Sequence, residues 1–314
     1  KYVYIALRRP DGYVGKPPEL GTGVFAMDTG NGSTSGPCFD STFVVDFALR
    51  KNPTSNSDNW WAVSRLTGKK YLVPNTTSDE SNHNDNPMDF NDGWAAGSIG
   101  SAMQSWMWKR HAGFDVVTYE GTGSNREINH SMGVAPTMMW VKRRNSSRYW
   151  GVYHSGLGDN RYLLKLNENE SYTNDQAAWN NTAPTSTHFS VGTSTTTNAD
   201  GDDYIAMLFA SVNGISKVGS YTGNGSTSGP TITTGFSPRF IIIKRTDGSG
   251  SWFTHDTVRG LSSGSSTSPY LRLDLDNTET SFTFGTISST GFTLATSGSS
   301  YNASGGEYIY YAHA

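Results

Sequence analysis

The sequence has a single cysteine, Cys38, among its 314 residues, so no disulfide can form within the chain. A small secreted domain held by disulfides is therefore excluded, and the core must be stable through packing alone. No apolar run approaches the ~18 residues of a membrane-spanning helix, so we expect no insertion into a membrane. Charged residues make up only 16% of the chain and the net charge is −3. This balance lacks the basic surface with which proteins bind nucleic acid.

The chain is instead rich in glycine, small polar residues and aromatic rings. It has 35 Gly, 16 Tyr, 14 Phe and 9 Trp, and the aromatic content of 12% argues against disorder. Aromatic residues among short polar ones favour pleated strands and tight turns over long helices. The composition therefore predicts an all-β protein, and its length predicts two or three domains.

Several blocks of the sequence occur more than once in the same order. TGNGSTSGP stands at residues 29–37 and again at residues 222–230. PTMMWVKRR, from Pro136, matches PRFIIIKRT, from Pro238, and each block is followed by a strand-like segment with one tryptophan, Trp150 or Trp252. Repeated order of this kind predicts an array of similar modules, and the glycine-rich block is interpreted as a structural turn.

The repeats divide the chain into modules of similar length. Within each, short apolar runs are separated by turn residues at the spacing of two-sheet antiparallel sandwiches. The fold class is therefore tandem antiparallel β-sandwich modules, arranged as either a rod or a compact cluster. The predicted borders give the last strand of a preceding module plus a linker (1–21), a divergent module (22–113) and two well-matched modules (114–215 and 216–314).

The repeated blocks also resemble a known family. VVTYEGTGSN, PTMMWVKRRNSSRYWGVYHSGLG and FIIIKRTDGSGSWFTHDTVRG are similar to the repeated β-sandwich modules of tailed-bacteriophage virion proteins of the tail-fibre type. The resemblance covers nearly all of residues 110–314, and residues 22–109 fit it less well. It implies a jelly-roll sandwich like those of concanavalin A and laminin G, at the surface of a virion. It implies no catalytic residues.

The expected function is accordingly that of a non-enzymatic virion structural protein: a tail fibre, a spike or a surface decoration. The implied partners are other virion proteins or copies of the chain itself, in a homo-oligomer such as a trimer, and a host surface glycan. A bacterial cell-surface adhesin built from the same sandwiches is an alternative.

A second alternative is a glycoside hydrolase of concanavalin-like fold that acts on a polysaccharide. In DLDNTE the carboxylates Asp274, Asp276 and Glu279 resemble the strand of such enzymes, on which alternating acids share one sheet face. The second module has KLNENES at this place, which breaks the pattern. A polar strand end that runs into a turn explains both segments, and no catalytic residue is assigned.

Two loops carry candidate binding residues. NHNDNPMDFND offers Asp85, Asp89 and Asp92 as hard oxygen ligands for Ca²⁺, although without the spacing of an EF-hand, and no other cofactor is expected. Aromatic rings beside amides or acids stack and hydrogen-bond sugars. The candidate carbohydrate-binding residues are Trp60, Trp61, Asp92, Trp94, Trp179 and Asn180, whereas Trp150 and Trp252 are expected in the core.

Overall fold

The computed structural model describes residues 20–33, 36–83, 88–95 and 102–314. The described residues form strands and loops but no α-helix. They also form three short 3₁₀ turns, which are η2 (Gly21–Gly23), η3 (Arg65–Thr67) and η4 (Ser155–Leu157). None of them forms a helix long and apolar enough to cross a membrane. The strand expected at the start of the chain, within residues 1–21, lies almost wholly outside the described residues.

The strands fall into three modules, named here by their strands. Module 1 contains β1 (Phe25–Thr29), β2 (Phe39–Asp40), β3 (Phe47–Lys51), β4 (Trp61–Ser64), β5 (Lys70–Leu72), β6 (Ser81–Asn82), β7 (Gly93–Trp94) and β8 (Gln104–Trp108). Module 2 contains β9 (Phe114–Glu120), β10 (Arg126–Asn129), β11 (Met138–Arg143), β12 (Gly151–His154), β13 (Tyr162–Lys165), β14 (Thr173–Asn174), β15 (His188–Val191) and β16 (Asp203–Phe209). Module 3 contains β17 (Ser216–Thr222), β18 (Thr231–Thr233), β19 (Phe240–Arg245), β20 (Phe253–Asp256), β21 (Thr267–Arg272), β22 (Thr280–Thr283), β23 (Gly285–Ser288), β24 (Gly291–Leu294) and β25 (Glu307–His313).

Each module pairs a six-stranded antiparallel sheet with a smaller outer sheet. The large sheets have equivalent strand orders, which are β1-β8-β3-β4-β5-β6, β9-β16-β11-β12-β13-β14 and β17-β25-β19-β20-β21-β22. The outer sheets are β2-β7, β10-β15 and β18-β24-β23. The predicted fold class, tandem antiparallel β-sandwich modules, is confirmed. The module borders drawn from the sequence stay a prediction.

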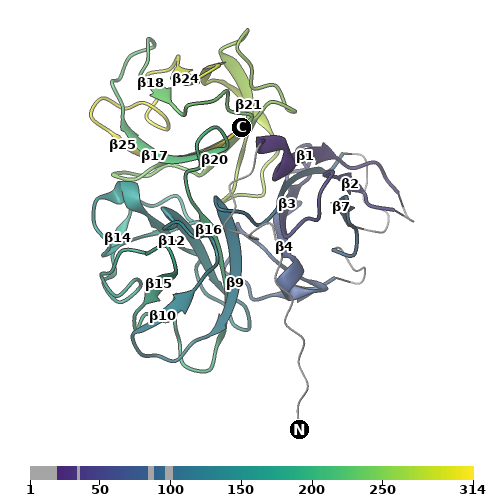
Figure 1. The fold of residues 1–314 in the computed structure, drawn as a ribbon. Coiled ribbons are helices and arrows are strands. Elements are labelled where there is room, and N and C mark those ends of the chain that lie inside the picture. The colour runs from purple at the N-terminus through teal and green to yellow at the C-terminus, as the bar shows by residue number, and fades with distance from the viewer. Residues whose placement is uncertain (1–19, 34–35, 84–87, 96–101) are drawn as a thin grey trace.

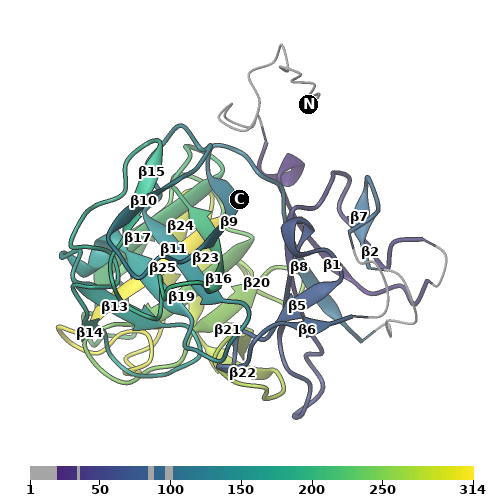
Figure 2. The same cartoon turned by 90° about the horizontal axis from the view of Figure 1, so that it is seen from below.

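The three large sheets pack around one shared core. Alternate residues of equivalent strands enter it, such as Met138 and Trp140 of β11, and the cluster includes buried side chains from all three modules. The residues between them, Met139 and Val141, face the separate core of module 2. Because both faces of the sheet are covered, the strand reads as one continuous apolar run. The modules therefore form a compact cluster rather than a rod (Figures 1 and 2).

Hydrogen bonds join the modules in a ring. Each module has a buried tryptophan immediately before the fourth strand of its large sheet, and its indole Nε1 donates to a carbonyl oxygen at the end of the fifth strand of another module. The three bonds are Trp60 to Arg272 at 2.8 Å, Trp252 to Lys165 at 2.9 Å and Trp150 to Val73 at 3.1 Å. They connect module 1 to 3, module 3 to 2 and module 2 to 1. The repeats are thus related by an approximate threefold arrangement.

A buried lysine stands at the same place in each module, near the end of the third strand of the large sheet: Lys51, Lys142 and Lys244. The Nζ of Lys244 donates to the carbonyl oxygen of Glu170 in module 2 at 2.8 Å, and that of Lys142 to Thr77 in module 1 at 3.3 Å. Burial lowers the pKa of both ammonium groups to about 8. Lys51 donates to backbone oxygens of its own module, whereas Lys142 and Lys244 contact backbone oxygens at the seams between modules. The three lysines are buried and form no positive surface.

Candidate functional site

Three of the candidate sugar-stacking rings are buried. Trp60 belongs to the shared core, Trp94 to the core of module 1 and Trp179 to the core of module 2. The indole of Trp94 donates to Ser105 Oγ at 2.8 Å, and that of Trp179 donates to the carbonyl oxygen of Tyr162 at 3.2 Å. A ring that is at most 1% exposed has no face for a sugar, so the structure corrects the expectation for these three residues. Their polar sequence neighbours gave a false impression of exposure.

Trp61 is only partly buried, but its ring is covered by its neighbours. It lies on the middle strand β4, with Arg50 of β3 at 3.7 Å over the ring and Tyr71 of β5 stacked at a centroid distance of 3.9 Å. Because these two strands flank β4, the two groups approach the indole from opposite sides. His83 meets it edge-on at 5.0 Å. The stack leaves no open face of the indole. Among the described residues, Trp61 makes no contact with the exposed Asp92 or with Asn180 of module 2, so the predicted sugar-binding residues do not form one site.

The three carboxylates of the enzymatic alternative lie beyond β21, in the turn before β22, and do not alternate along one strand. Asp274 is buried and accepts the backbone N–H of Trp252 at 3.0 Å. Burial raises the pKa of this carboxyl. The equivalent acceptors in modules 1 and 2 are Asn75 and Asn167, which bind the N–H of Trp60 and Trp150. The role of Asp274 is therefore one that an amide performs elsewhere in the chain.

Glu279 likewise occupies a seam position. Its backbone N–H donates to the carbonyl oxygen of Pro53 in module 1 at 2.7 Å. The equivalent bonds at the other two seams run from Glu80 to Arg144 and from Tyr172 to Thr246. A tyrosine serves at this place in module 2, so the position does not require a carboxylate.

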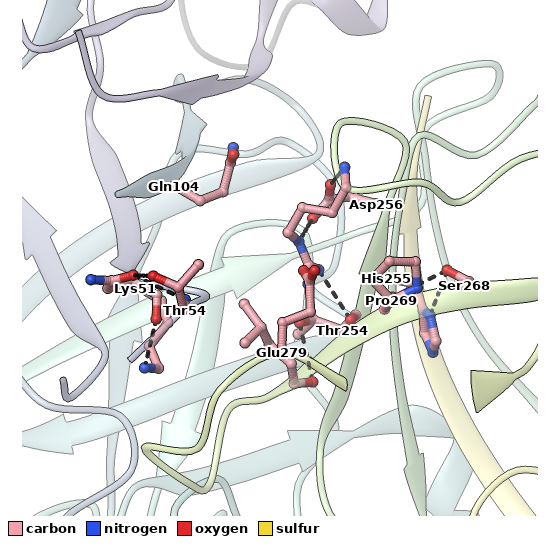
Figure 3. A network of polar contacts seen from close by, with 12 residues as sticks. Lys51, Thr54, Gln104, Thr254, His255, Asp256, Ser268, Pro269 and Glu279 are labelled. Atoms are coloured by element: carbon pink, nitrogen blue, oxygen red, sulfur yellow. Dashed lines mark hydrogen bonds and ion pairs between the residues drawn. The ribbon is translucent and has the colours of Figure 1, made fainter. Parts of the chain in front are cut away.

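A cluster of buried charge joins modules 1 and 3 (Figure 3). Asp256, fully buried, accepts from Arg259 Nε at 2.6 Å and from the indole of Trp106 at 3.0 Å. Arg259 also binds Glu279 at 2.9 Å. Asp256 stands where Ser64 and His154 stand in the other modules, and all three side chains accept an N–H of the following turn. The cluster thus has a full set of partners and a structural role.

Five histidines are buried in the described part of the chain, and burial lowers the pKa of one of them, His130, which lies near the carboxylate of Asp115. The other four, without a carboxylate partner, are His111, His154, His255 and His313. Desolvation lowers the pKa of His154 to about 4 and that of the other three to about 3. His255 lies between Ser268 Oγ and Tyr301 Oη, at 3.1 and 3.0 Å. Burial therefore keeps these rings neutral, and they contribute to packing. Protonating them inside the fold is unfavourable, so they should lower the stability of the protein in acid.

The calcium loop is only partly described. Asp85 lies outside the described residues, and Asp89 and Asp92 are exposed. The backbone oxygen of Asp92 accepts from the N–H groups of Ser41 and Thr42. Among the residues that the structure describes, no group of three His, Cys, Asp or Glu side chains could hold a metal ion. Calcium binding by this loop stays a prediction.

Of the sequence-predicted site residues, Asn180 lines a groove. The groove has a volume of about 430 Å³ and lies on the outer sheet of module 2. The strands of that sheet, β10 and β15, are at the lower left of Figure 1. The lining of the groove is polar throughout and consists of Asn125, Arg126, Glu127, Asn180, Thr182 and Ser190. The other five residues were not predicted, because they come from two strands and a loop that are apart in sequence.

A known protein family matches most of the chain. Residues 93–314, more than two thirds of the chain, match the family described as "Domain of unknown function (DUF7483)". The match begins at β7, so it includes modules 2 and 3 and leaves out β1–β6 of module 1. No curated protein matches the chain.

Proposed function

Given that the chain belongs to the DUF7483 family of domains of unknown function, we propose that it is a non-enzymatic structural protein of a tailed-bacteriophage particle. It would be exposed on the virion as part of a tail fibre, a spike or a surface decoration. Its neighbours there would be other virion proteins or further copies of the chain.

The observation that carries this proposal is the closed ring of three modules. The residues that suggested an enzyme have structural partners: the Asp274 carboxylate accepts from Trp252 within module 3, and the backbone N–H of Glu279 donates to module 1. Two buried lysines, Lys142 and Lys244, donate to carbonyl oxygens of a neighbouring module. The ring is held by packing and hydrogen bonds, and the Cys38 side chain is buried. A rigid scaffold without disulfides suits a protein that assembles inside a reducing cytoplasm and then works outside the cell.

The resemblance of the repeated blocks to tail-fibre modules supports the same assignment. The blocks are specific in their order, and they lie in the two modules that match each other best, between about residue 110 and residue 314. The virion assignment rests on this resemblance, whereas the scaffold role rests on the geometry.

The test is to find the protein on a particle. Antibodies raised against residues 93–314 are applied to gradient-purified particles of a phage that encodes the chain, and bound gold is located by electron microscopy. Labelling of the tail or capsid surface, together with the protein's peptides in the particle proteome, is the expected result. A protein made in infected cells but absent from purified particles would overturn the proposal.

The hydrolase alternative has its own test. The purified chain and its Glu279→Gln variant are incubated with bacterial and algal polysaccharides, and reducing ends are measured. We expect no release by either protein. Cleavage by the wild type that Glu279→Gln abolishes would make the protein a glycanase.

A further inference from the structure

Modules 2 and 3 differ at one edge of their outer sheets. In module 3 the strand β23 pairs with β24, so the sheet has three strands. In module 2 the sheet has only β10 and β15, and the chain before β15 forms turns. The two ends of the missing strand are nevertheless in place. The N–H of Gly192 donates to the carbonyl oxygen of Ala178, as that of Ala295 donates to Phe284 in module 3.

The segment between these anchor points is longer in module 2. At the end nearest β15, the N–H of Thr185 donates to the carbonyl oxygen of His188 at 2.8 Å. The equivalent pair in module 3 is Ser288 and Gly291. Residues 179–184 therefore stand where module 3 has only residues 285–287. The longer segment bulges out, with Asn180 and Asn181 in the left-handed region at φ of 51° and 48°. Asn tolerates this conformation better than most residues do.

The bulge leaves Ser190 of β15, which is 5% exposed, without a paired strand on this side. The equivalent residue in module 3, Thr293, pairs with Thr286 of β23. The N–H of His130 donates to the carbonyl oxygen of Thr187, so these two residues are a hydrogen-bonded pair of the ladder. Hydrogen-bonded and non-hydrogen-bonded pairs alternate in an antiparallel sheet, and Ser190, opposite Glu127, is three residues further along and belongs to a non-hydrogen-bonded pair. The backbone N–H and C=O of Ser190 therefore point away from β10, toward the bulge. The hydroxyl of Ser190 makes no hydrogen bond within the described part of the chain, and it lies in the groove.

The walls of the groove add further donors and acceptors. On the side of β10, Glu127 lies directly opposite Ser190 in the sheet, and its carboxylate is 3.3 Å from His188 Nε2. Arg126 binds the carbonyl oxygen of Glu120 through one guanidinium nitrogen at 2.9 Å, so its other N–H groups can serve a ligand. On the side of the bulge are the amide of Asn180 and the hydroxyl of Thr182, which donates to the carbonyl oxygen of Asn180 at 2.8 Å and can still accept.

We propose that this groove binds one sugar unit of a polysaccharide through its hydroxyl groups. Amides, hydroxyls and a carboxylate within one pocket can each donate to or accept from a vicinal diol. The groove has a volume of about 430 Å³ and is open to solvent, so one sugar unit could enter it while the rest of the polysaccharide stays outside. An extended peptide does not fit as an added strand, because Ala178 and Thr185 close the edge on both sides of Ser190.

The lining contains no aromatic ring, so one groove is expected to bind weakly, with a Kd of about 1 mM. Several copies on one particle would bind a polysaccharide together with higher overall affinity. The inference rests on the proposed function only for the source of the sugar, which would be the host surface.

The test uses the whole chain labelled with ¹⁵N and a panel of monosaccharides and bacterial-surface oligosaccharides. A binding sugar is expected to shift the backbone amide signal of Ser190 and those of residues 125–127 and 180–182. Glu127→Gln and Asn180→Gly should each weaken binding about tenfold. Glycine is chosen at position 180 because it adopts the left-handed conformation of Asn180 without strain. Thr286→Ala, on the strand that replaces the bulge in module 3, is the matched control and should bind as the wild type does.

Two results would overturn the inference. One is the absence of binding by every sugar of the panel at about ten times that expected Kd. The other is binding that shifts other amides and survives both groove variants. Neither result depends on where the protein sits, so a failed virion localisation leaves this test intact, and the reverse also holds.

Discussion

The indole nitrogen of Trp60 and the carbonyl oxygen of Arg272 form a hydrogen bond of 2.8 Å between residues that are 212 positions apart. Two equivalent bonds, from Trp150 and Trp252, complete a ring in which every module is both a donor and an acceptor. Since each bond joins a different pair of modules, the loss of any one module leaves two faces of the shared core uncovered. The three modules are therefore expected to unfold together.

Trp252→Phe tests this ring. Phenylalanine fills most of the space but leaves the carbonyl oxygen of Lys165 without its donor, so the free energy of unfolding should fall by about 1–3 kcal/mol. Urea unfolding followed by fluorescence and by circular dichroism should give one transition for both proteins. Trp61→Phe, at a partly exposed ring outside the shared core, is the control. Separate transitions for single modules would contradict the shared core.

Arg259→Met tests the buried charge cluster. The change leaves the carboxylate of Asp256 buried without its cationic partner, which should lower the free energy of unfolding by about 3–5 kcal/mol. Arg161→Met is the matched control, because the pair of Arg161 and Asp159 is exposed and its loss should be barely measurable. Similar melting temperatures for the two variants would show that Asp256 finds another partner.

Asp274→Asn separates a structural acceptor from a catalytic acid. An amide oxygen can accept the N–H of Trp252 as Asn75 and Asn167 do in the other modules, so stability should change by less than about 1 kcal/mol. Asp274→Ala removes the acceptor and should cost about 1–3 kcal/mol. Thermal unfolding at neutral pH compares the two. An asparagine variant as unstable as the alanine variant would mean that the charge itself is needed.

The buried histidines predict a loss of stability in acid. Their folded-state pKa values, about 3 to 4, lie below the ordinary value of 6.5. Below pH 6.5 the unfolded chain therefore binds protons that the folded chain does not. Each histidine lowers the free energy of unfolding by up to about 1.4 kcal/mol per pH unit between roughly pH 6.5 and its folded pKa.

Melting temperatures measured from pH 7 to pH 4 should accordingly fall steeply below pH 6. His111→Asn removes one titrating group while its side-chain oxygen can still accept the N–H of Gly113, so this variant should show a shallower fall. An unchanged slope would mean that His111 becomes protonated without unfolding.

The repeated blocks allowed much of the fold to be predicted. The order of the strands, the match between modules 2 and 3, and the burial of Trp150 and Trp252 all follow from aligned positions. Trp60 was misassigned because it stands in NWWAV beside polar residues, although the same alignment places it with Trp150 and Trp252. The equivalence of Asn75, Asn167 and Asp274 is a signal of the same kind.

The shared core and the groove could not be predicted in this way. A continuous apolar run such as FIIIK shows that both faces of a strand are covered, but not that the cover on one face is another module. The groove depends on a bulge of residues 179–184 and on the register of β10 with β15. Register is set by long-range pairing, to which a single sequence gives little access.

Closure of the ring also fixes how such a protein can grow. Three large sheets already cover one another, so duplication of a single module would give a copy with no free seam to join. A longer relative would have to add complete rings, or single modules that fold independently and are joined by linkers. The number three is thus a property of the architecture, and an outward-facing loop such as residues 179–184 can take up extra length without disturbing the seams.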